Sequence, residues 1–221
     1  MVLEFLRRKR RLSDVAAKPA LPSLRKLARI LVIDDDPNSF PFKPLQSEGY
    51  NIEWWGQVDN IGRLEAGEFD IIILDIVGVA SQWSSQDGLG VLEHLKNRSP
   101  AQIIVAFSGH TFDLSKTRFW KLADETLPKP VDALKCMQVI DNILETTFTA
   151  KHYWDGISEL LRANGVPQRR IDSLEDNLAR AIDDGAKVDY ASRFRGLLKT
   201  TEHTITLVSL GEKIGKLVGI M

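Results

Sequence analysis

Five short runs of apolar, mostly β-branched residues recur between residues 30 and 128, and they constrain the fold more than any other feature of the sequence. The runs are ILVI at 30–33, NIEWW at 51–55, DIIIL at 70–74, QIIVAF at 102–107 and ETLP at 125–128. Runs that are apolar on both faces are typical of parallel strands covered by helices on each side. Segments with helical spacing lie between and after them, as at 131–145, with Leu134, Met137, Ile140 and Leu144. This alternation predicts an α/β domain with a five-stranded, parallel, doubly wound sheet of the flavodoxin-like kind.

Polar residues follow four of these five runs. Asp34 and Asp35 come after the first run, Asp75 after the third, Ser108 after the fourth and Lys129 after the fifth. Because the carboxyl ends of parallel strands meet at one edge of the sheet, we expect these side chains to share a crevice. Clustered carboxylates repel one another unless a cation lies among them, and hard oxygen ligands suit Mg²⁺. A carboxylate beside such an ion can attack a phosphoryl group, with the hydroxyl and the ammonium holding its oxygens.

The segments ILVIDDDP, DIIILD, VAFSG and LPKP, in this order and at these spacings, resemble the receiver domain of two-component response regulators, the CheY-like superfamily. The resemblance covers roughly residues 28 to 147. It implies that Asp75 is the phosphoacceptor and that Asp34 and Asp35 bind Mg²⁺ together with it. It also implies that the backbone carbonyl of Val77 completes the metal site.

The same resemblance gives roles to two further residues and to a partner. It implies that Ser108 moves towards the phosphoryl group on activation, that Lys129 pairs with that group, and that the Lys129-Pro130 peptide is cis. It also implies a phosphoryl donor, which is either a sensor histidine kinase or a phosphotransfer protein. Alternatively, the domain is a scaffold that keeps the fold and has lost phosphorylation.

Three features depart from the usual receiver pattern. Pro41 and Pro44 fall where the first helix should run, so that helix is expected to be short or broken. The loop after Asp75 is longer than in relatives, because VGVASQWSSQ, which includes Trp83, intervenes before Asp87 and Gly88. Thr126 stands where relatives often carry the aromatic switch residue. We therefore expect an unusual surface for the phosphoryl donor and a coupling to the output that does not use an aromatic ring.

The charge of the chain is distributed unevenly, although its formal net value is only -1. Residues 1–29 carry a net charge of +7 and residues 30–149 a net charge of -9. The sequence therefore predicts a basic, flexible N-terminal arm over residues 1–27 and a receiver domain over 28–148. The arm is either a solvated tail or a contact for an anionic surface such as nucleic acid or lipid.

Residues 149–221 are expected to form a small all-α domain for output or dimerisation, acting through a protein partner or by self-association. Residues 157–178 also resemble a helix-turn-helix, which would make the chain a DNA-binding transcriptional regulator. Acidic residues in the second helix of that motif, Asp172, Glu175 and Asp176, argue against this alternative, because helices that face phosphate are normally basic. The tail carries Gly211, Gly215 and Gly219 on one helical face, which favours packing of a last helix, a dimer seam or a helix lying on a membrane surface.

Composition limits the remaining classes. A single cysteine, Cys136, excludes an internal disulfide framework, and no apolar stretch reaches the length of a membrane-spanning helix. A single cysteine is also what a reducing compartment permits, so a cytoplasmic location is expected. At the start of the chain a short apolar run precedes the charges, which is the reverse of a secretory signal. The leading hypothesis is an atypical response regulator, a Mg²⁺-dependent phosphoacceptor rather than an enzyme acting on a separate substrate.

Overall fold

The computed structural model describes residues 9–15, 19–109, 117–198 and 200–220, and these fall into two compact units. The α/β unit comprises Ala20–Phe148. The helical unit comprises Thr149–Met221 together with the described residues before Ala20.

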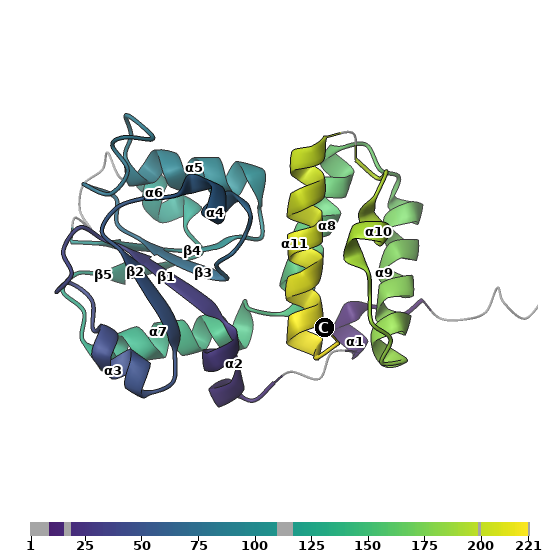
Figure 1. Cartoon of the computed structure of the whole chain (residues 1–221), viewed down its shortest axis with the longest axis horizontal. Helices are drawn as coiled ribbons and strands as arrows, with labels where there is room; N and C mark the ends of the chain where they lie inside the picture. Colours follow the sequence, from purple (N-terminus) through teal and green to yellow (C-terminus); the bar gives the residue numbers. More distant parts are fainter. Residues whose placement is uncertain (1–8, 16–18, 110–116, 199, 221) are drawn as a thin grey trace, which may run out of the picture. The chain divides into compact units, whose positions relative to one another are not determined.

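The α/β unit is built on one five-stranded sheet in which all neighbouring strands are parallel (Figure 1). Its strands are β1 (Arg29–Ile33), β2 (Asn51–Trp55), β3 (Ile71–Leu74), β4 (Ile103–Ser108) and β5 (Glu125–Pro128). Their order is β2-β1-β3-β4-β5, which is the doubly wound, flavodoxin-like order. Every residue of β3 and β4 is buried, as both-sided apolar runs require. The predicted fold class is confirmed.

Among the described residues, the two faces of this sheet are covered by the helices α2 (Leu21–Leu27), α3 (Phe42–Ser47), α4 (Ile61–Glu65), α5 (Gly88–Arg98), α6 (Thr117–Leu122) and α7 (Ala133–Thr146). Helices α4, α5 and α6 lie on one face, and α2, α3 and α7 lie on the other (Figure 1). Helix α3 has six residues, so the prediction of a short first helix is confirmed. One detail of the predicted stripe is wrong, because Leu134 is 76% exposed; the buried residues of α7 are Cys136, Ile140, Ile143 and Leu144.

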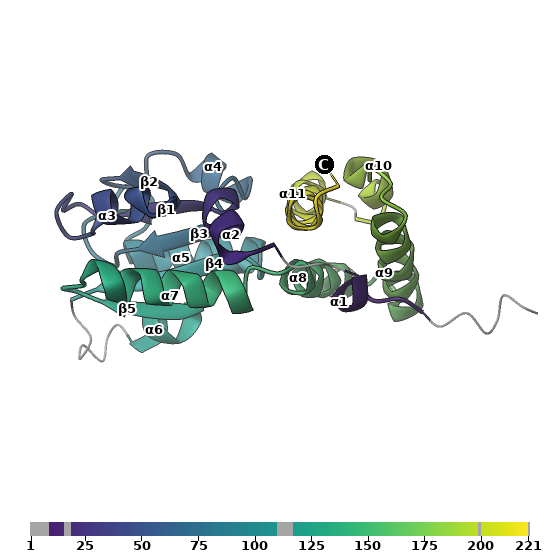
Figure 2. The ribbon, with the colours of Figure 1, turned by 90° about the horizontal axis from the view of Figure 1, so that it is seen from below.

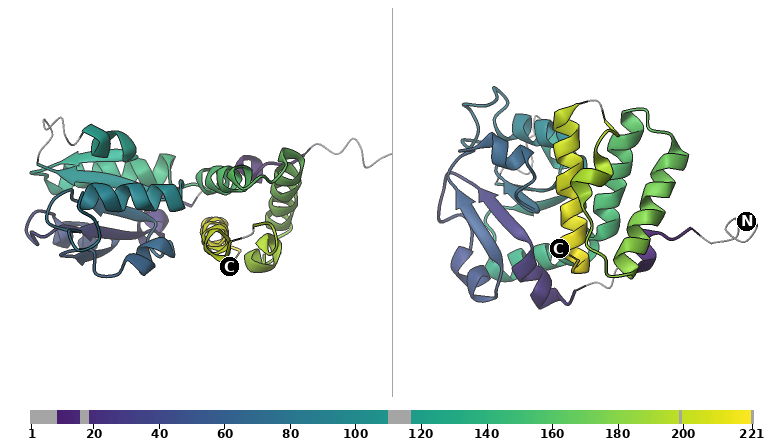
Figure 3. Two further views of the ribbon diagram at one scale, coloured as in Figure 1. Left: turned by 90° about the horizontal axis from the view of Figure 1, so that it is seen from above. Right: turned by 45° about the vertical axis from the view of Figure 1, so that its right-hand side comes forward.

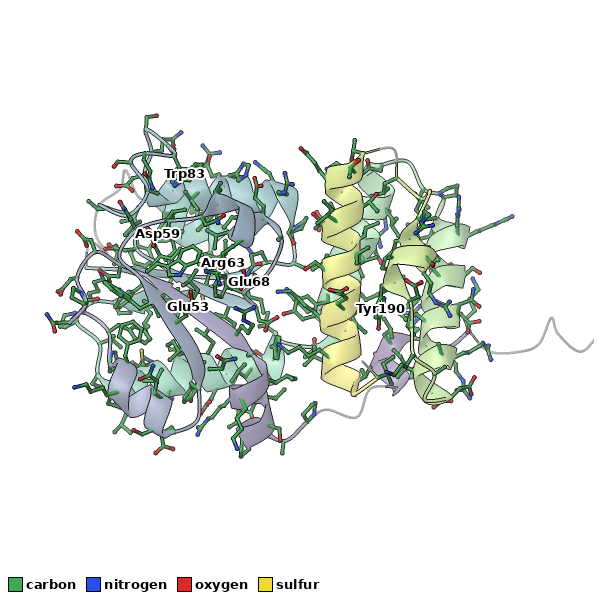
Figure 4. The ribbon with its side chains drawn as sticks, in the orientation of Figure 1. Glu53, Asp59, Arg63, Glu68, Trp83 and Tyr190 are labelled. Carbon is green, nitrogen blue, oxygen red and sulfur yellow. The ribbon has the colours of Figure 1, made fainter. Side chains whose placement is uncertain are left out.

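A cluster of charged and aromatic residues ties α4 to the edge of the sheet. Arg63 donates two hydrogen bonds to Glu68, at 2.5 and 2.7 Å, and its guanidinium lies over the rings of Trp55 and Phe69. Glu53 pairs with Arg63 at 3.4 Å, and Arg29 pairs with Glu68 at 2.6 Å; Glu53, Arg63 and Glu68 are labelled in Figure 4. The hydrogen bonds from Arg63 lower the pKa of Glu68 to about 2.

The boundary before the α/β unit differs from the predicted one. Residues 20–27 were expected in a flexible arm, yet α2 packs on α7 with Leu24 fully buried. Arg25 donates to both carboxylate oxygens of Asp141, at 3.0 and 2.6 Å, and Tyr50 donates to the same carboxylate at 2.6 Å. The arm prediction failed here because the partner of Arg25 lies 116 residues away in the sequence.

The helical unit contains α1 (Leu12–Val15), α8 (Ala150–Ala163), α9 (Gln168–Asp183), α10 (Tyr190–Phe194) and α11 (Thr201–Val218). Helix α11 lies alongside α8 and contacts α10 (Figure 3). Gly165, with φ of +79°, follows the C-cap of α8 and lets the chain leave the helix. Gly211 faces α10, and a Cβ atom there would lie 2.4 Å from the ring of Tyr190. An all-α C-terminal region is therefore confirmed, and at Gly211 the absence of a side chain serves packing within the unit.

The described part of the predicted N-terminal arm is folded onto this unit. Helix α1 contacts α8 and α9, with Leu12 buried (Figure 2). Lys9 forms an ion pair with Asp172 at 3.2 Å, and Arg10 donates its backbone N–H to Asp176 at 2.8 Å. Residues 9–15 therefore correct the prediction of a flexible arm, because the basic segment finds a complementary acidic face on α9. Residues 1–8 and 16–18 of the predicted arm lie outside the described residues.

No helix among the described residues is long and apolar enough to span a membrane.

Candidate functional site

Three carboxylates meet at the carboxyl edge of the sheet. Asp34 directly follows β1, Asp35 is the next residue, and Asp75 directly follows β3. One carboxylate oxygen from each lies within 4.8 Å of the others. Asp34 is completely buried and Asp75 is 7% exposed, whereas Asp35 faces solvent. The strand order places β1 beside β3, where the direction of winding reverses and doubly wound proteins form their crevice.

Lys129 supplies a positive charge to the buried pair. It follows β5, and its Nζ lies 2.6 Å from Asp34 Oδ2 and 2.7 Å from Asp75 Oδ2. Burial raises the pKa of Asp75 above its usual value, although the ammonium of Lys129 opposes this shift. Burial also works to lower the pKa of Lys129, but its hydrogen bonds to Asp34 and Asp75 outweigh that effect and hold the pKa above its ordinary value.

Asp34 is fixed by further hydrogen bonds from its own loop and from β2. The backbone N–H of Asp36 donates to Oδ1 at 3.0 Å, and the hydroxyl of Ser39 donates to Oδ2 at 2.6 Å. The indole N–H of Trp54 donates to the backbone carbonyl of Asp34 at 2.9 Å. Sequence reasoning missed Ser39, because its contact depends on the turn that replaces the start of the first helix.

The backbone around Asp75 is closely packed. Its Oδ1 accepts a hydrogen bond from the N–H of Ile76 at 2.7 Å. A Cβ atom at Gly88 would lie 2.2 Å from the carbonyl oxygen of Asp75, so the first residue of α5 has to be glycine for this approach. Gly78 has φ of +83°, a left-handed conformation that favours glycine, and a Cβ atom there would lie 2.8 Å from Oδ2 of Asp35.

The other predicted site residues lie at the same edge. Ser108 ends β4, is almost completely buried, and its carbonyl accepts the N–H of Lys129 at 3.2 Å. Val77 lies two residues after Asp75, and its side chain is exposed. The Lys129-Pro130 peptide is cis, as the resemblance implies. Thr126 lies within β5, two positions before the strand ends.

The lengthened loop after β3 is held in place by its own hydrogen bonds. The carboxylate of Asp87 accepts the backbone N–H of Gly78 at 2.6 Å and of Ala80 at 2.5 Å. The indole N–H of Trp83 donates to the carbonyl of Val58 at 2.6 Å, while 47% of the residue is exposed (Figure 4). The insertion therefore presents an aromatic side chain to solvent from a fixed position.

The chemistry of the donor set fits a small, hard cation. All three side chains are carboxylates, and Asp35 remains accessible to solvent beside the buried pair. Oxygen ligands that leave positions for water are what Mg²⁺ requires. The described residues therefore include a cluster that could hold Mg²⁺ through Asp34, Asp35 and Asp75.

Comparisons with known proteins find similarity among solved structures. A CheY-like receiver domain protein from Methanospirillum hungatei is 22% identical, with 54% of this chain and 95% of that chain covered and a TM-score of 0.47. The receiver domain of NtrX from Brucella abortus is 26% identical, covering 53% of this chain and 98% of that chain with a TM-score of 0.44. A two-component response regulator from Clostridium difficile is 23% identical, covering 54% and 97% with a TM-score of 0.46.

No protein-family model and no curated protein matches the chain. The structural similarities each cover about half of it. By its own strand order and strand-end residues, the α/β unit has the fold of a response regulator receiver domain.

Proposed function

We propose that the chain is an atypical two-component response regulator whose α/β unit accepts a phosphoryl group on Asp75 in a Mg²⁺-dependent reaction. The observation that carries the proposal is the meeting of Asp34, Asp35 and Asp75 within 4.8 Å, with Lys129 bonded to two of them. Such a cluster of like charges is costly unless cations bind it, and phosphoryl transfer uses both a metal ion and a fixed ammonium.

The residues support an in-line transfer. A carboxylate oxygen of Asp75 attacks phosphorus, the bond to the donor nitrogen or oxygen breaks, and the electron pair of that bond leaves with the donor. Bound Mg²⁺ would offset the charge of the transferred phosphoryl oxygens. Lys129 lies 2.7 Å from Asp75 and provides a second cation for those oxygens, and the hydroxyl of Ser108 is the nearby donor on β4.

The proposed donor is a sensor histidine kinase or a phosphotransfer protein, and the proposed output is a protein partner or self-association of the helical unit. DNA binding is the weaker alternative. The acidic face of α9 is engaged by Lys9 and Arg10, so this helix does not offer a basic surface to phosphate. If the DNA alternative holds, the whole chain should bind random duplex DNA with a steep salt dependence.

Intact-mass analysis after treatment with acetyl phosphate and Mg²⁺ tests the proposal. The wild-type chain should gain one phosphoryl group, and chelation of Mg²⁺ should prevent the gain. Asp75→Asn should remain unmodified, whereas the control Asp59→Asn, an exposed carboxylate on the loop after β2, should react like wild type (Figure 4). A wild-type chain that stays unmodified would support a scaffold without phosphorylation.

A further inference from the structure

The turn after β1 brings a hydroxyl into the carboxylate cluster. Between the end of β1 and the start of α3 at Phe42, the chain folds back on itself instead of continuing as a helix. The backbone N–H of Ser39 donates to the carbonyl of Asp36 at 3.1 Å, and the carboxylate of Asp36 accepts the N–H of Asn38 at 2.9 Å. These bonds fix the turn so that the side chain of Ser39 points to Asp34.

The carboxylates of Asp34 and Asp35 differ in their hydrogen bonding. The carboxylate of Asp34 accepts from the N–H of Asp36, from the hydroxyl of Ser39 and from Lys129, which fills three of its roughly four acceptor positions. Within the described part of the chain, no hydrogen bond is seen to the carboxylate of Asp35, which lies against Gly78 and faces solvent. Asp34 is therefore a fixed support, and Asp35 is the more open ligand.

We propose that Ser39 is a positioning residue of the metal site, acting through Asp34. This inference rests on the proposed function, since it requires that the cluster binds Mg²⁺. Outer partners that orient a ligating carboxylate typically contribute 10–100-fold to metal affinity. At 2.6 Å, the bond from the Ser39 hydroxyl is as short as the contact from Lys129 on the same oxygen, so both set the direction of that carboxylate.

Titration of the full chain with MgCl₂ in a calorimeter tests this role. Ser39→Ala should weaken Mg²⁺ binding about 10-fold, and Ser39→Thr, which keeps the hydroxyl, should stay within about 2-fold of wild type. The control is Ser47→Ala, which removes a hydroxyl bonded to the carbonyl of Lys43 in the neighbouring helix. It should leave the Mg²⁺ affinity unchanged.

The phosphorylation rate with acetyl phosphate gives a second readout. In Ser39→Ala, the Mg²⁺ concentration for half the maximal rate should rise by the same factor of about 10, while the rate at saturating Mg²⁺ stays within about 2-fold of wild type. An unchanged Mg²⁺ affinity in Ser39→Ala overturns the inference and leaves the proposed function standing. A lowered rate at saturating Mg²⁺ without a change in affinity also overturns it. A wild-type chain that binds no Mg²⁺ overturns the proposed function itself.

Discussion

Replacing Lys129 by methionine should make the stability of the α/β unit depend on Mg²⁺. The side chain of Lys129 contacts the carboxylates of both Asp34 and Asp75 and is 20% exposed. Methionine keeps much of its apolar length and removes its charge. Two buried carboxylates, with oxygens within 4.8 Å of each other, would then lack this counter-ion.

The size of the effect follows from these distances. Two unit charges 4.8 Å apart repel by about 3 kcal/mol at an effective dielectric constant of 20. Breaking a buried ion pair by removing one partner costs roughly 3–5 kcal/mol, and the partial exposure of Lys129 favours the lower end. We therefore expect Lys129→Met to lower the free energy of unfolding by about 3 kcal/mol at neutral pH. The melting temperature should fall by roughly 10 °C.

A bound cation should restore most of this loss. A ligand at about 100 times its Kd stabilises the folded state by about 2.7 kcal/mol. Without the competing ammonium, the variant should bind Mg²⁺ more tightly than wild type, so Mg²⁺ should raise its melting temperature by more.

Thermal unfolding followed by circular dichroism, in EDTA and in excess MgCl₂, measures both quantities. Lys96→Met is a matched control, because Lys96 forms a partly buried pair with Asp124 at 2.6 Å outside the carboxylate cluster. Its stability should fall without any added dependence on Mg²⁺. The reasoning is refuted if Lys129→Met is as stable as wild type in EDTA, or if Mg²⁺ shifts the melting temperatures of both chains equally.

Three further changes test the packing and charge of the two units. Gly211→Ala should destabilise the chain in urea by about 1 kcal/mol, because overpacking against Tyr190 costs more than the roughly 1 kcal/mol gained in helix propensity; greater stability would contradict the close approach. Glu68→Gln should be destabilising at neutral pH, and its difference from wild type should shrink as the pH falls from 4.5 to about 2, because a lowered folded pKa contributes its full stability above the unfolded value of 4.5 and loses it as the carboxylate is protonated in the folded chain. A constant difference across this range would refute that account. Leu12→Ala should lower the free energy of unfolding by about 2 kcal/mol and Ser13→Ala by almost none; equal effects would show that Leu12 is not a core residue.

The sheet and the location of its crevice could be predicted because their signals are local. Strands buried on both faces must be continuous apolar runs, and side chains that follow parallel strands must share one edge. The positions of Asp34, Asp75 and Lys129 followed from these two rules alone. Helix α3 was predictable as a short element for a similarly local reason, since prolines are tolerated only at a helix start: Pro41 is its N-cap and Pro44 lies in its first turn.

The failures of prediction concern contacts between distant segments. Arg25 and Asp141 are separated by 116 residues, and Lys9 and Asp172 by 163. Charge patterns along a chain do not reveal such pairs, so a net charge of +7 over residues 1–29 favoured a solvated arm. Ser39 was missed for a related reason, because its bond to Asp34 depends on a turn whose geometry no spacing rule specifies.

The folded N-terminal segment also changes the argument about the output. From the sequence, the acids of α9 were the main objection to DNA binding, because they would repel phosphate. In the structure, Asp172 is paired with Lys9, and Asp176 accepts the backbone N–H of Arg10. Part of that repulsion is therefore neutralised, but the same bonds use a basic side chain that the arm was expected to offer to an anionic surface. These contacts therefore weaken two electrostatic arguments: that the acids of α9 repel DNA, and that the N-terminal segment binds an anionic surface. In the helical unit, residues 9–15 already occupy the acidic face of α9.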